Sequence, residues 1–500
     1  EGRLAFQTGA VRAAPLSAER LGFDGRYGVS GSEVFGVRGT VSLAGARLAP
    51  ATVAGVRGAL AATAGSPLGP LGAALSTAIE RAARRADAKA ALALQQRPDG
   101  GRLTVSGFDL ASASGARAKL DDGHLEYRWG DGAGTRVEGR ATLGGGGFPD
   151  ARVTLAQPRI GAPITGEAVV APYQAGAARM VVAPVRFTAA PDGATRFTTA
   201  VTLDGPLGDG RIAGLSLPLA GRFGPDGRVV LGEACVPLRF KALAVAGMRL
   251  GETRLPLCPA AGAAMLSRSP GGGLTGGARI AAPKLTGRVG EVPLTIAAGS
   301  LGIAVGHPGF TAERLAVRLG AGDAVTRLDV VRLSGGVGKD GFGGRIDGAA
   351  GQIANVPLRL SAGEGGWRLV DGALSLTGRL AVDDSASPPR FRTLVSDDVA
   401  LVLKDGTIRA TGTLAEPKTR RGIAGVTLTH TLATGRGGAR LAVPGLTFGD
   451  ALQPEALTPL TLGIVANVVG TITGEGRIDW TPDGVTSVGD FASDSLDFAA

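Results

Sequence analysis

The sequence predicts an all-β protein with one helical segment, built as an elongated, twisted and curled antiparallel sheet. Three features predict this class: strand-like runs alternate apolar and polar residues, Asp-Gly pairs recur between the runs, and glycine reaches 83 of 500 residues. Alternation with a period of two is typical of a strand whose two faces differ. Asp-Gly provides the positive φ angles that a tight hairpin turn needs.

Length and composition predict a thin layer of sheet rather than a bulky core. A chain of 500 residues is too long for one ordinary core, and 44% hydrophobic residues argue against disorder. Aromatic residues make up only 4%, so small and aliphatic side chains must do most of the packing. At roughly 12–14 residues for a strand and its turn, the chain supplies on the order of 35–40 strands.

Two segments show the expected strand-and-turn plan most clearly. Residues 399–414 contain Asp405-Gly406 between two alternating runs, and residues 118–129 contain Asp121-Asp122-Gly123. We expect a hairpin at each position. Further Asp-Gly turns are expected at several places, among them Asp371-Gly372.

A sheet of this width must curl, because twist accumulates from strand to strand. Its concave face would then form a long hydrophobic groove. The candidates to line it are Leu125, Tyr127, Trp129, Leu374, Leu376, Leu380, Leu401 and Leu403. Polar neighbours such as Glu126, Arg379 and Lys404 alternate with them and are expected on the opposite face. An apolar groove could hold lipid tails, since each buried methylene contributes about 0.8 kcal/mol.

One segment departs from the strand pattern. Residues 66–94 begin with leucines and an isoleucine at helical spacing and continue into an alanine-rich run. We expect a helix packed on the sheet edge or across its mouth, with a membrane-surface helix as the alternative. The expected organisation is therefore a β-groove segment over 1–65, the helix over 66–94, a continuous β-groove over 95–450, and a C-terminal region over 451–500.

The two cysteines indicate an oxidising compartment. Cys235 and Cys258 flank two strand-like runs joined by a turn at Gly247, and a hairpin would bring the two thiols within reach of each other. We predict a disulfide between them, the alternative being two separate buried thiols. A stable disulfide is typical of a periplasm or another oxidising space.

Signatures of catalysis and of nucleic-acid binding are missing. His124, His307 and His430 are isolated, no metal-ligand spacing is present, and no nucleophile elbow or carboxylate pair stands out. The net charge of +10 comes from scattered arginines rather than from a basic patch with interleaved aromatics. No apolar run reaches the roughly 20 residues of a membrane span. We predict no enzyme activity, no cofactor, no metal and no nucleic-acid partner.

The C-terminal residues carry a resemblance to a known family. Ala466–Gly470, Gly474–Trp480, Gly484–Ser487 and Asp494–Ala500 resemble the YdbH-like family of the AsmA-like group, which also contains TamB. The resemblance implies a periplasmic bridge-like protein, anchored in the inner membrane, that passes phospholipids between the inner and outer membranes and supports outer-membrane integrity. It implies phospholipid acyl chains and the outer membrane or its proteins as partners. Because the chain is expected to be a fragment, the N-terminal anchor and the C-terminal end would lie outside it.

Two other classes remain open at this point. A secreted adhesin or autotransporter-type β-helix would show short, regular coils and a solid core. An envelope polysaccharide enzyme would need a polar cleft with paired carboxylates.

Overall fold

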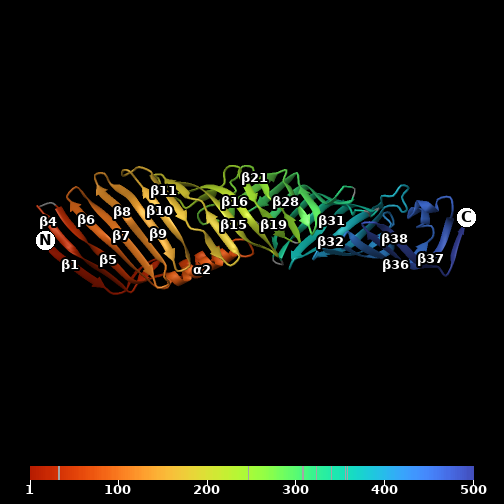
Figure 1. The fold of residues 1–500 in the computed structure, drawn as a ribbon, viewed down its shortest axis with the longest axis horizontal. Helices are drawn as coiled ribbons and strands as arrows, with labels where there is room; N and C mark the ends of the chain where they lie inside the picture. The colour runs from red at the N-terminus through yellow and green to blue at the C-terminus, as the bar shows by residue number, and fades with distance from the viewer. Residues whose placement is uncertain are drawn as a thin grey trace. The chain divides into compact units, whose positions relative to one another are not determined.

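The computed structural model describes residues 1–31, 34–245, 247–306, 309–322, 324–338, 341–354, 356 and 358–499. His307 lies outside these residues. Figure 1 shows the chain as a ribbon in which strands predominate. Its residue contacts divide the chain into two compact units. The first unit comprises residues 1–207, 211–240 and 264–274, and the second comprises residues 208–210, 241–263 and 275–500.

Strands account for most of the described chain. Up to residue 250 they are β1 (Gly2–Thr8), β2 (Val11–Ala13), β3 (Leu16–Ala18), β4 (Arg20–Ser30), β5 (Val34–Leu48), β6 (Ala86–Arg97), β7 (Gly100–Ser112), β8 (Arg117–Gly130), β9 (Gly134–Gly145), β10 (Phe148–Ala156), β11 (Ile164–Val170), β12 (Tyr173–Ala175), β13 (Ala178–Val182), β14 (Val185–Ala189), β15 (Thr195–Leu207), β16 (Gly210–Phe223), β17 (Val229–Leu231), β18 (Val236–Phe240), β19 (Ala242–Val245) and β20 (Met248–Leu250).

The remaining strands are β21 (Thr253–Pro259), β22 (Leu266–Arg268), β23 (Leu274–Thr275), β24 (Gly277–Ala281), β25 (Lys284–Val289), β26 (Val292–Ala297), β27 (Ser300–Ala304), β28 (Gly309–Ala321), β29 (Ala324–Gly338), β30 (Gly341–Gln352), β31 (Leu358–Val370), β32 (Ala373–Asp384), β33 (Leu394–Lys404), β34 (Thr407–Ala415), β35 (Gly422–Thr431), β36 (Arg436–Phe448), β37 (Ala466–Thr481), β38 (Gly484–Ala492) and β39 (Leu496–Ala499). The helices are α1 (Pro50–Ala61) and α2 (Gly69–Ala83), with short 3-10 turns η1 (Pro454–Ala456) and η2 (Pro459–Thr461).

Each unit is built on a long antiparallel ladder. In the first unit the hydrogen-bonded order runs β1, β4, β5, then each strand to β11, and continues through β14 to β15. In the second unit it runs β20, β25, β26, β28 and then each strand to β38. The predicted all-β, curled antiparallel fold is confirmed.

The Asp-Gly turns behave as predicted at two hairpins. Asp405 and Gly406 both have positive φ, at 49° and 71°, and join Lys404 directly to Thr407 across the β33–β34 pair. Asp371 and Gly372, at 48° and 73°, join β31 to β32 in the same way. Positive φ at both central residues is the geometry whose twist matches that of the flanking strands.

The hairpin expected at residues 121–123 is wrong. β8 runs without a break from Arg117 to Gly130, and its pairing with β9 only shifts register between Asp121 and His124. Asp122, with φ at 48°, forms a bulge in the strand. A Cβ on Gly123 would lie 2.2 Å from the Glu138 carbonyl oxygen, so the bulge depends on a residue without a side chain.

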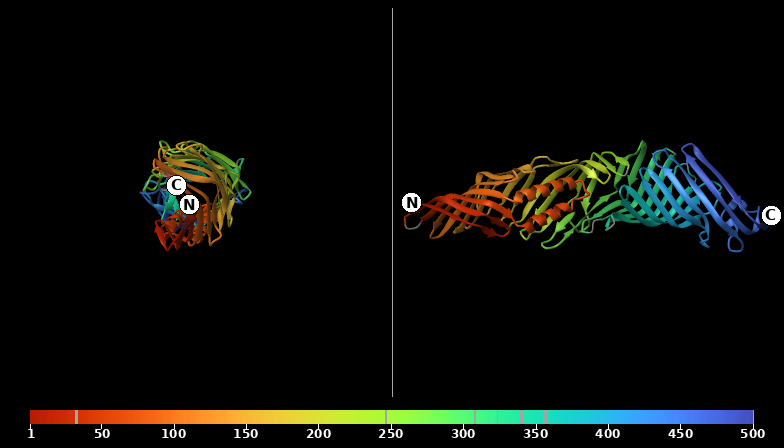
Figure 2. Two further views of the ribbon diagram at one scale, coloured as in Figure 1. Left: turned by 90° about the vertical axis from the view of Figure 1, so that its left-hand side faces the viewer. Right: turned by 90° about the horizontal axis from the view of Figure 1, so that it is seen from below.

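The helical region also differs from expectation. α2 ends at Ala83, and residues 86–94, which were expected to continue the helix, belong to β6, which lies between β5 and β7. α1 precedes α2 and was not predicted, because none of its residues is buried and its sequence has little amphipathic pattern. Figure 2 shows the two helices side by side on the first unit. Pairing with two neighbouring strands outweighs the helix propensity of the alanines in β6.

The chain buries little of its surface for its size. The accessible area of the chain is 27916 Å², whereas two compact units of half its mass would together expose about 20,000 Å². No large side chain in the described part of the chain is fully buried. The buried apolar residues described in the structure form small clusters, such as that of Val330, Ile346 and Trp367, rather than one large core.

Candidate functional site

The apolar face of the second unit follows directly from strand register. Leu374 pairs with Leu403 and Leu376 pairs with Leu401, so these four leucines share one face of β32 and β33. All four are half-buried, whereas the alternate residues Lys404 and Val402 are exposed. Strand alternation thus separates the two faces as expected, although Val402 shows that the exposed face is not uniformly polar.

An aromatic cluster continues this face over the neighbouring strands. Trp367 is buried with Val330 and Ile346, and Leu374 and Leu376 pack against this cluster. Phe310 and Phe342 stack with ring centroids 5.8 Å apart, and the Trp367 indole donates to the Ser334 carbonyl at 3.0 Å. Leu380 is half-buried and pairs with Ser396 beyond a register shift, away from the pairs formed by the other four leucines.

The three other residues predicted to line the groove, Leu125, Tyr127 and Trp129, lie in the first unit. Leu125 pairs with Val105 and with Val137, and Tyr127 stacks on Trp129 with centroids 5.9 Å apart. Leu125 is 42% exposed and Tyr127 is 49% exposed, which is unusual for large apolar side chains that share one face. The eight candidates therefore fall into a set of three in one unit and a set of five in the other.

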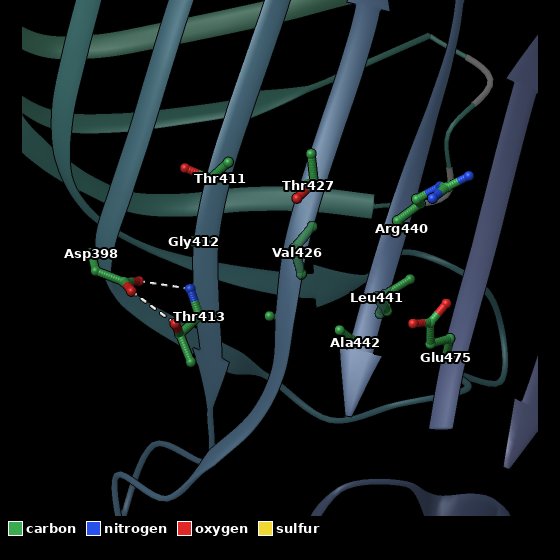
Figure 3. A pocket seen from close by; sticks show the side chains of 11 residues that line it. Asp398, Thr411, Gly412, Thr413, Val426, Thr427, Arg440, Leu441, Ala442 and Glu475 are labelled. Carbon is green, nitrogen blue, oxygen red and sulfur yellow. Dashed lines mark hydrogen bonds between the residues drawn. The ribbon is translucent and has the colours of Figure 1, made fainter. Parts of the chain in front are cut away.

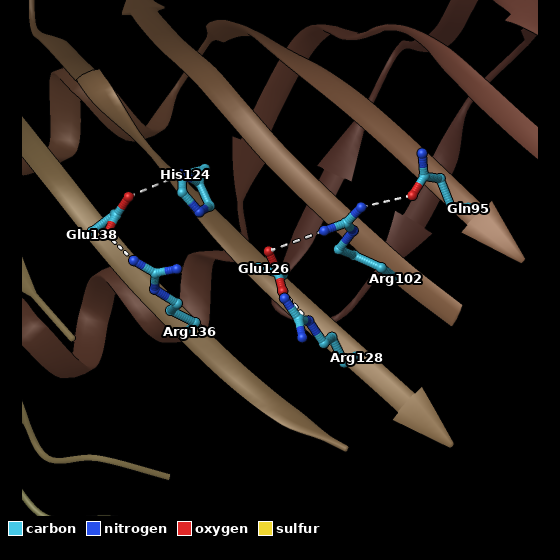
Figure 4. A network of polar contacts seen from close by, with 7 residues as sticks. All are labelled: Gln95, Arg102, His124, Glu126, Arg128, Arg136 and Glu138. Carbon is cyan, nitrogen blue, oxygen red and sulfur yellow. Dashed lines mark hydrogen bonds and ion pairs between the residues drawn. The ribbon is translucent and has the colours of Figure 1, made fainter. Parts of the chain in front are cut away.

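The opposite face of β6–β9 carries a polar network (Figure 4). Glu126, only 5% exposed, forms ion pairs with Arg128 and with Arg102, the latter at 4.0 Å. Arg136 contacts Glu138 at 2.7 Å, and His124 lies 3.6 Å from the same carboxylate. The Arg102 guanidinium also donates a hydrogen bond to the side-chain oxygen of Gln95 at 2.7 Å. The network holds its carboxylates in ion pairs, which gives them a structural role on this face.

α2 shows how the first unit curls. Its buried Leu71 packs against Ala178 and Leu203, which belong to β13 and β15. The same helix also contacts β5. In the ladder, β5 and β15 lie at opposite ends of one run of hydrogen-bonded strands. One helix can contact both only if the sheet between them bends. Leu203 pairs with Met180 on the face shared by Phe187 and Phe197, so α2 lies on the apolar side.

A cavity of about 260 Å³ shows the corresponding curl in the second unit. Leu319 of β28 and Thr326 of β29 line it together with His430 of β35, although many strands separate them in the ladder. His430 is 3% exposed, and its Nδ1 accepts a hydrogen bond from the Trp480 indole at 3.1 Å. Burial lowers the pKa of His430 below its ordinary value, which favours the uncharged imidazole.

Sequence reasoning did not single out His430 as part of this arrangement. A signal was present, because His430 alternates with Leu428 and Val426 and therefore belongs to the apolar face of β35. Trp480 falls on the same face of β37 through the pairings of β36. The contact between these two side chains depends on that register, which a single sequence does not supply.

A shallow cavity of about 420 Å³ lies on the polar side of β33–β37 (Figure 3). Asp398 accepts hydrogen bonds there from the Thr413 amide at 2.7 Å and the Thr413 hydroxyl at 2.8 Å. These bonds lower the pKa of the Asp398 carboxyl. Arg440 and Glu475 complete the polar lining. With its carboxylate already bonded, Asp398 is suited to holding the β33–β34 pair.

Other site types were sought over the same residues. Within the described ranges, no group of three or more His, Cys, Asp or Glu side chains is placed to hold a metal ion. Helices long and apolar enough to cross a membrane are absent from those ranges. Cys235 and Cys258 are both disulfide-bonded, which confirms the predicted pairing.

These features define a class of protein: a curled antiparallel sheet with one apolar face. Residues 8–500 match the YdbH-like family, described as intermembrane phospholipid transport protein YdbH. The chain belongs to this family, as the C-terminal resemblance indicated. The family consists of transport proteins rather than a known class of enzymes, and it implies intermembrane phospholipid transport with lipid as cargo. No curated protein and no solved structure matches the chain.

Proposed function

We propose that this protein is a periplasmic, bridge-like lipid carrier that moves phospholipids between the inner and outer membranes along a hydrophobic β-groove. It would be anchored in the inner membrane and would support outer-membrane integrity. The observation that carries the proposal is the apolar face itself. Large side chains such as Leu125 and Tyr127 remain exposed on this face. The opposite face of the same strands carries charged side chains that are hydrogen-bonded to one another.

The energetics of such a face suit a moving cargo. Transfer of a methylene group out of water contributes about 0.8 kcal/mol, so a 16-carbon tail gains on the order of 10 kcal/mol from an apolar groove. This gain needs no specific contact and is similar at each position along the face. A lipid can then move from strand to strand, because it does not have to escape from a tight binding site at any position.

The alternative of an adhesin-type β-helix has little support. A β-helix stacks parallel coils, whereas the described strand pairs of both ladders are antiparallel. An enzyme of envelope polysaccharides would need a cleft with paired carboxylates. The polar cavity does contain two carboxylates, those of Asp398 and Glu475. Asp398, however, is hydrogen-bonded to Thr413, which lowers the pKa of its carboxyl and makes it unsuited to act as a general acid.

The test uses adjacent residues on opposite faces. Leu403→Arg places a charge on the apolar face, where a charge among lipid tails is costly to desolvate. Val402→Arg is the matched control, because Val402 is 42% exposed on the other face. Each variant is expressed in a strain that lacks this protein and its relatives. We expect Leu403→Arg to rescue the strain at least tenfold less well than the parent protein, and Val402→Arg to rescue it as well as the parent does.

Rescue is scored by outer-membrane permeability, with protein abundance and thermal melting measured for each variant. Leu125→Arg repeats the test in the first unit at a side chain that is already exposed, so its folding should be unaffected. Equal rescue by Leu403→Arg, Leu125→Arg and Val402→Arg would show that the apolar face is only a structural face.

A further inference from the structure

Two turns that are far apart along the ladder of the second unit lie against each other. Gly290 is in the β25–β26 turn and Ala433 is in the β35–β36 turn. A Cβ on Gly290 would lie 3.5 Å from the Cβ of Ala433, which is ordinary van der Waals contact. Between the two turns the hydrogen-bonded ladder passes through β26, β28 and every strand to β35. The sheet therefore curls until one rim meets the other.

The cavity beneath this contact is apolar. Val292, Leu319 and Ile353 line it from one side, and His430, Leu432 and Pro482 line it from the other. His430 is uncharged at neutral pH because it is buried, and one of its nitrogens already accepts from Trp480. Among the described residues that line the cavity, the polar side chains apart from His430 are those of Thr326 and Thr434, which carry hydroxyls.

We propose that Gly290 and Ala433 form a clasp that closes the apolar groove and must part for a phospholipid to pass. This inference rests on the proposed function. Lipid tails match the apolar wall, but the phosphate head group would lose its hydration beneath the clasp without gaining a cationic partner. The head group can therefore pass only through the gap that opens when the two turns separate. The two turns meet without a backbone hydrogen bond in the described part of the chain, so little holds the clasp shut.

The decisive experiment locks the clasp with a disulfide. The Cβ separation at this contact is at the short end of the disulfide range, so Gly290→Cys combined with Ala433→Cys should bridge under oxidising conditions. The purified full chain is assayed for transfer of fluorescent phosphatidylethanolamine between vesicles of phosphatidylethanolamine and phosphatidylglycerol. We expect the oxidised variant to transfer at least tenfold more slowly, and reduction with dithiothreitol to restore transfer.

The parent protein receives the same reductant, because its own bridge between Cys235 and Cys258 is also exposed to reduction. A locked variant that transfers as fast as the parent overturns the clasp. A folded variant that forms no bridge overturns it as well, because the two turns are then not in contact. A parent that transfers no lipid overturns both the clasp and the proposed function, so the two failures are distinguished.

A matched pair of cysteines controls for the substitutions themselves. Gly435 and Pro482 lie in the neighbouring β35–β36 and β37–β38 turns, with a Gly435 Cβ 3.6 Å from the ring of Pro482. Gly290 and Gly435 have similar positive φ values of 58° and 65°, so a cysteine is strained equally at both. Gly435→Cys with Pro482→Cys links two turns on the same rim. Both positions line the cavity, so this variant is compared with itself before and after oxidation, and bridging should not slow its transfer. Equal slowing of both pairs on oxidation contradicts the clasp.

Discussion

At the scale of single residues, the unusual feature is a polar pair on an apolar face. Trp480 is 2% exposed and donates to His430, so the indole N–H has a partner although it lies among apolar side chains. A buried donor without an acceptor would destabilise the fold. The pair thus combines a large apolar contact with a satisfied hydrogen bond, and it makes the second unit sensitive to protonation of His430.

Protonation of His430 should lower stability in mild acid. The pKa of His430 is lower in the folded chain than its ordinary value of 6.5, so the unfolded chain binds the proton more tightly. The contribution of this group to stability is complete above pH 6.5 and is lost as the pH falls through that value toward the lower folded pKa.

The measurement is the thermal midpoint of the second unit's unfolding at pH 7.5 and at pH 5.5. His430→Gln keeps an acceptor for Trp480 but does not titrate, so its midpoint should fall less over this range. An equal fall in the variant and the parent would show that other groups cause the acid sensitivity.

At the scale of elements, α2 has a different role from a core helix. Leu71 and Ala78 are buried, whereas Arg81 and Arg84 are exposed. Its contacts extend along the ends of several strands: the Ser112 hydroxyl donates to the Ala82 carbonyl at 3.2 Å, and a Cβ on Gly147 would lie 3.2 Å from the Cβ of Ala78. α2 therefore connects strands that have no hydrogen bonds to each other and holds the curl of the first unit.

Truncation of the anchoring side chain should release this helix. Leu71→Ala removes a buried side chain packed on Ala178 and Leu203 and should cost about 2–4 kcal/mol. Val56→Ala in α1 is the control, because Val56 is exposed and should change stability by less than about 0.5 kcal/mol. Hydrogen exchange of the peptide containing α2 reports the local opening free energy. Similar protection in both variants would contradict a docking role for Leu71.

At the scale of the whole molecule, the large accessible surface is the dominant property. The chain exposes 27916 Å², and its described residues include many exposed large hydrophobic side chains. Soluble proteins rarely leave large contiguous apolar patches uncovered unless something binds to them. A cargo of phospholipid would cover the apolar face and would stabilise the folded chain by mass action.

Purified protein should therefore contain phospholipid, and its removal should lower stability. We expect lipid extraction and mass spectrometry to recover phospholipids, and the thermal midpoint to fall after delipidation and to recover when phospholipid vesicles are added. Lys404→Glu, a change on the exposed alternate face, should retain the same amount of lipid as the parent. Protein that carries no phospholipid and melts identically before and after delipidation would contradict the proposal.

Much of the architecture was predictable because it is encoded locally. Alternation along β32 and β33 assigns Leu374 and Leu403 to one face, and Asp405-Gly406 specifies a tight turn through its positive φ angles. The cysteine spacing predicted the disulfide, and the C-terminal residues indicated the family. Each of these signals depends on a few neighbouring residues, so a single sequence was enough to detect it.

Only the tertiary structure decided which distant segments meet. The bulge at Asp122-Gly123, strand β6 in place of a longer helix, the docking of α2 and the contact of Gly290 with Ala433 all depend on how far the sheet bends. That bend is the sum of small twists over many strand pairs, and bulges change it locally. Sequence patterns report the face of a side chain, but the accumulated twist determines what that face meets.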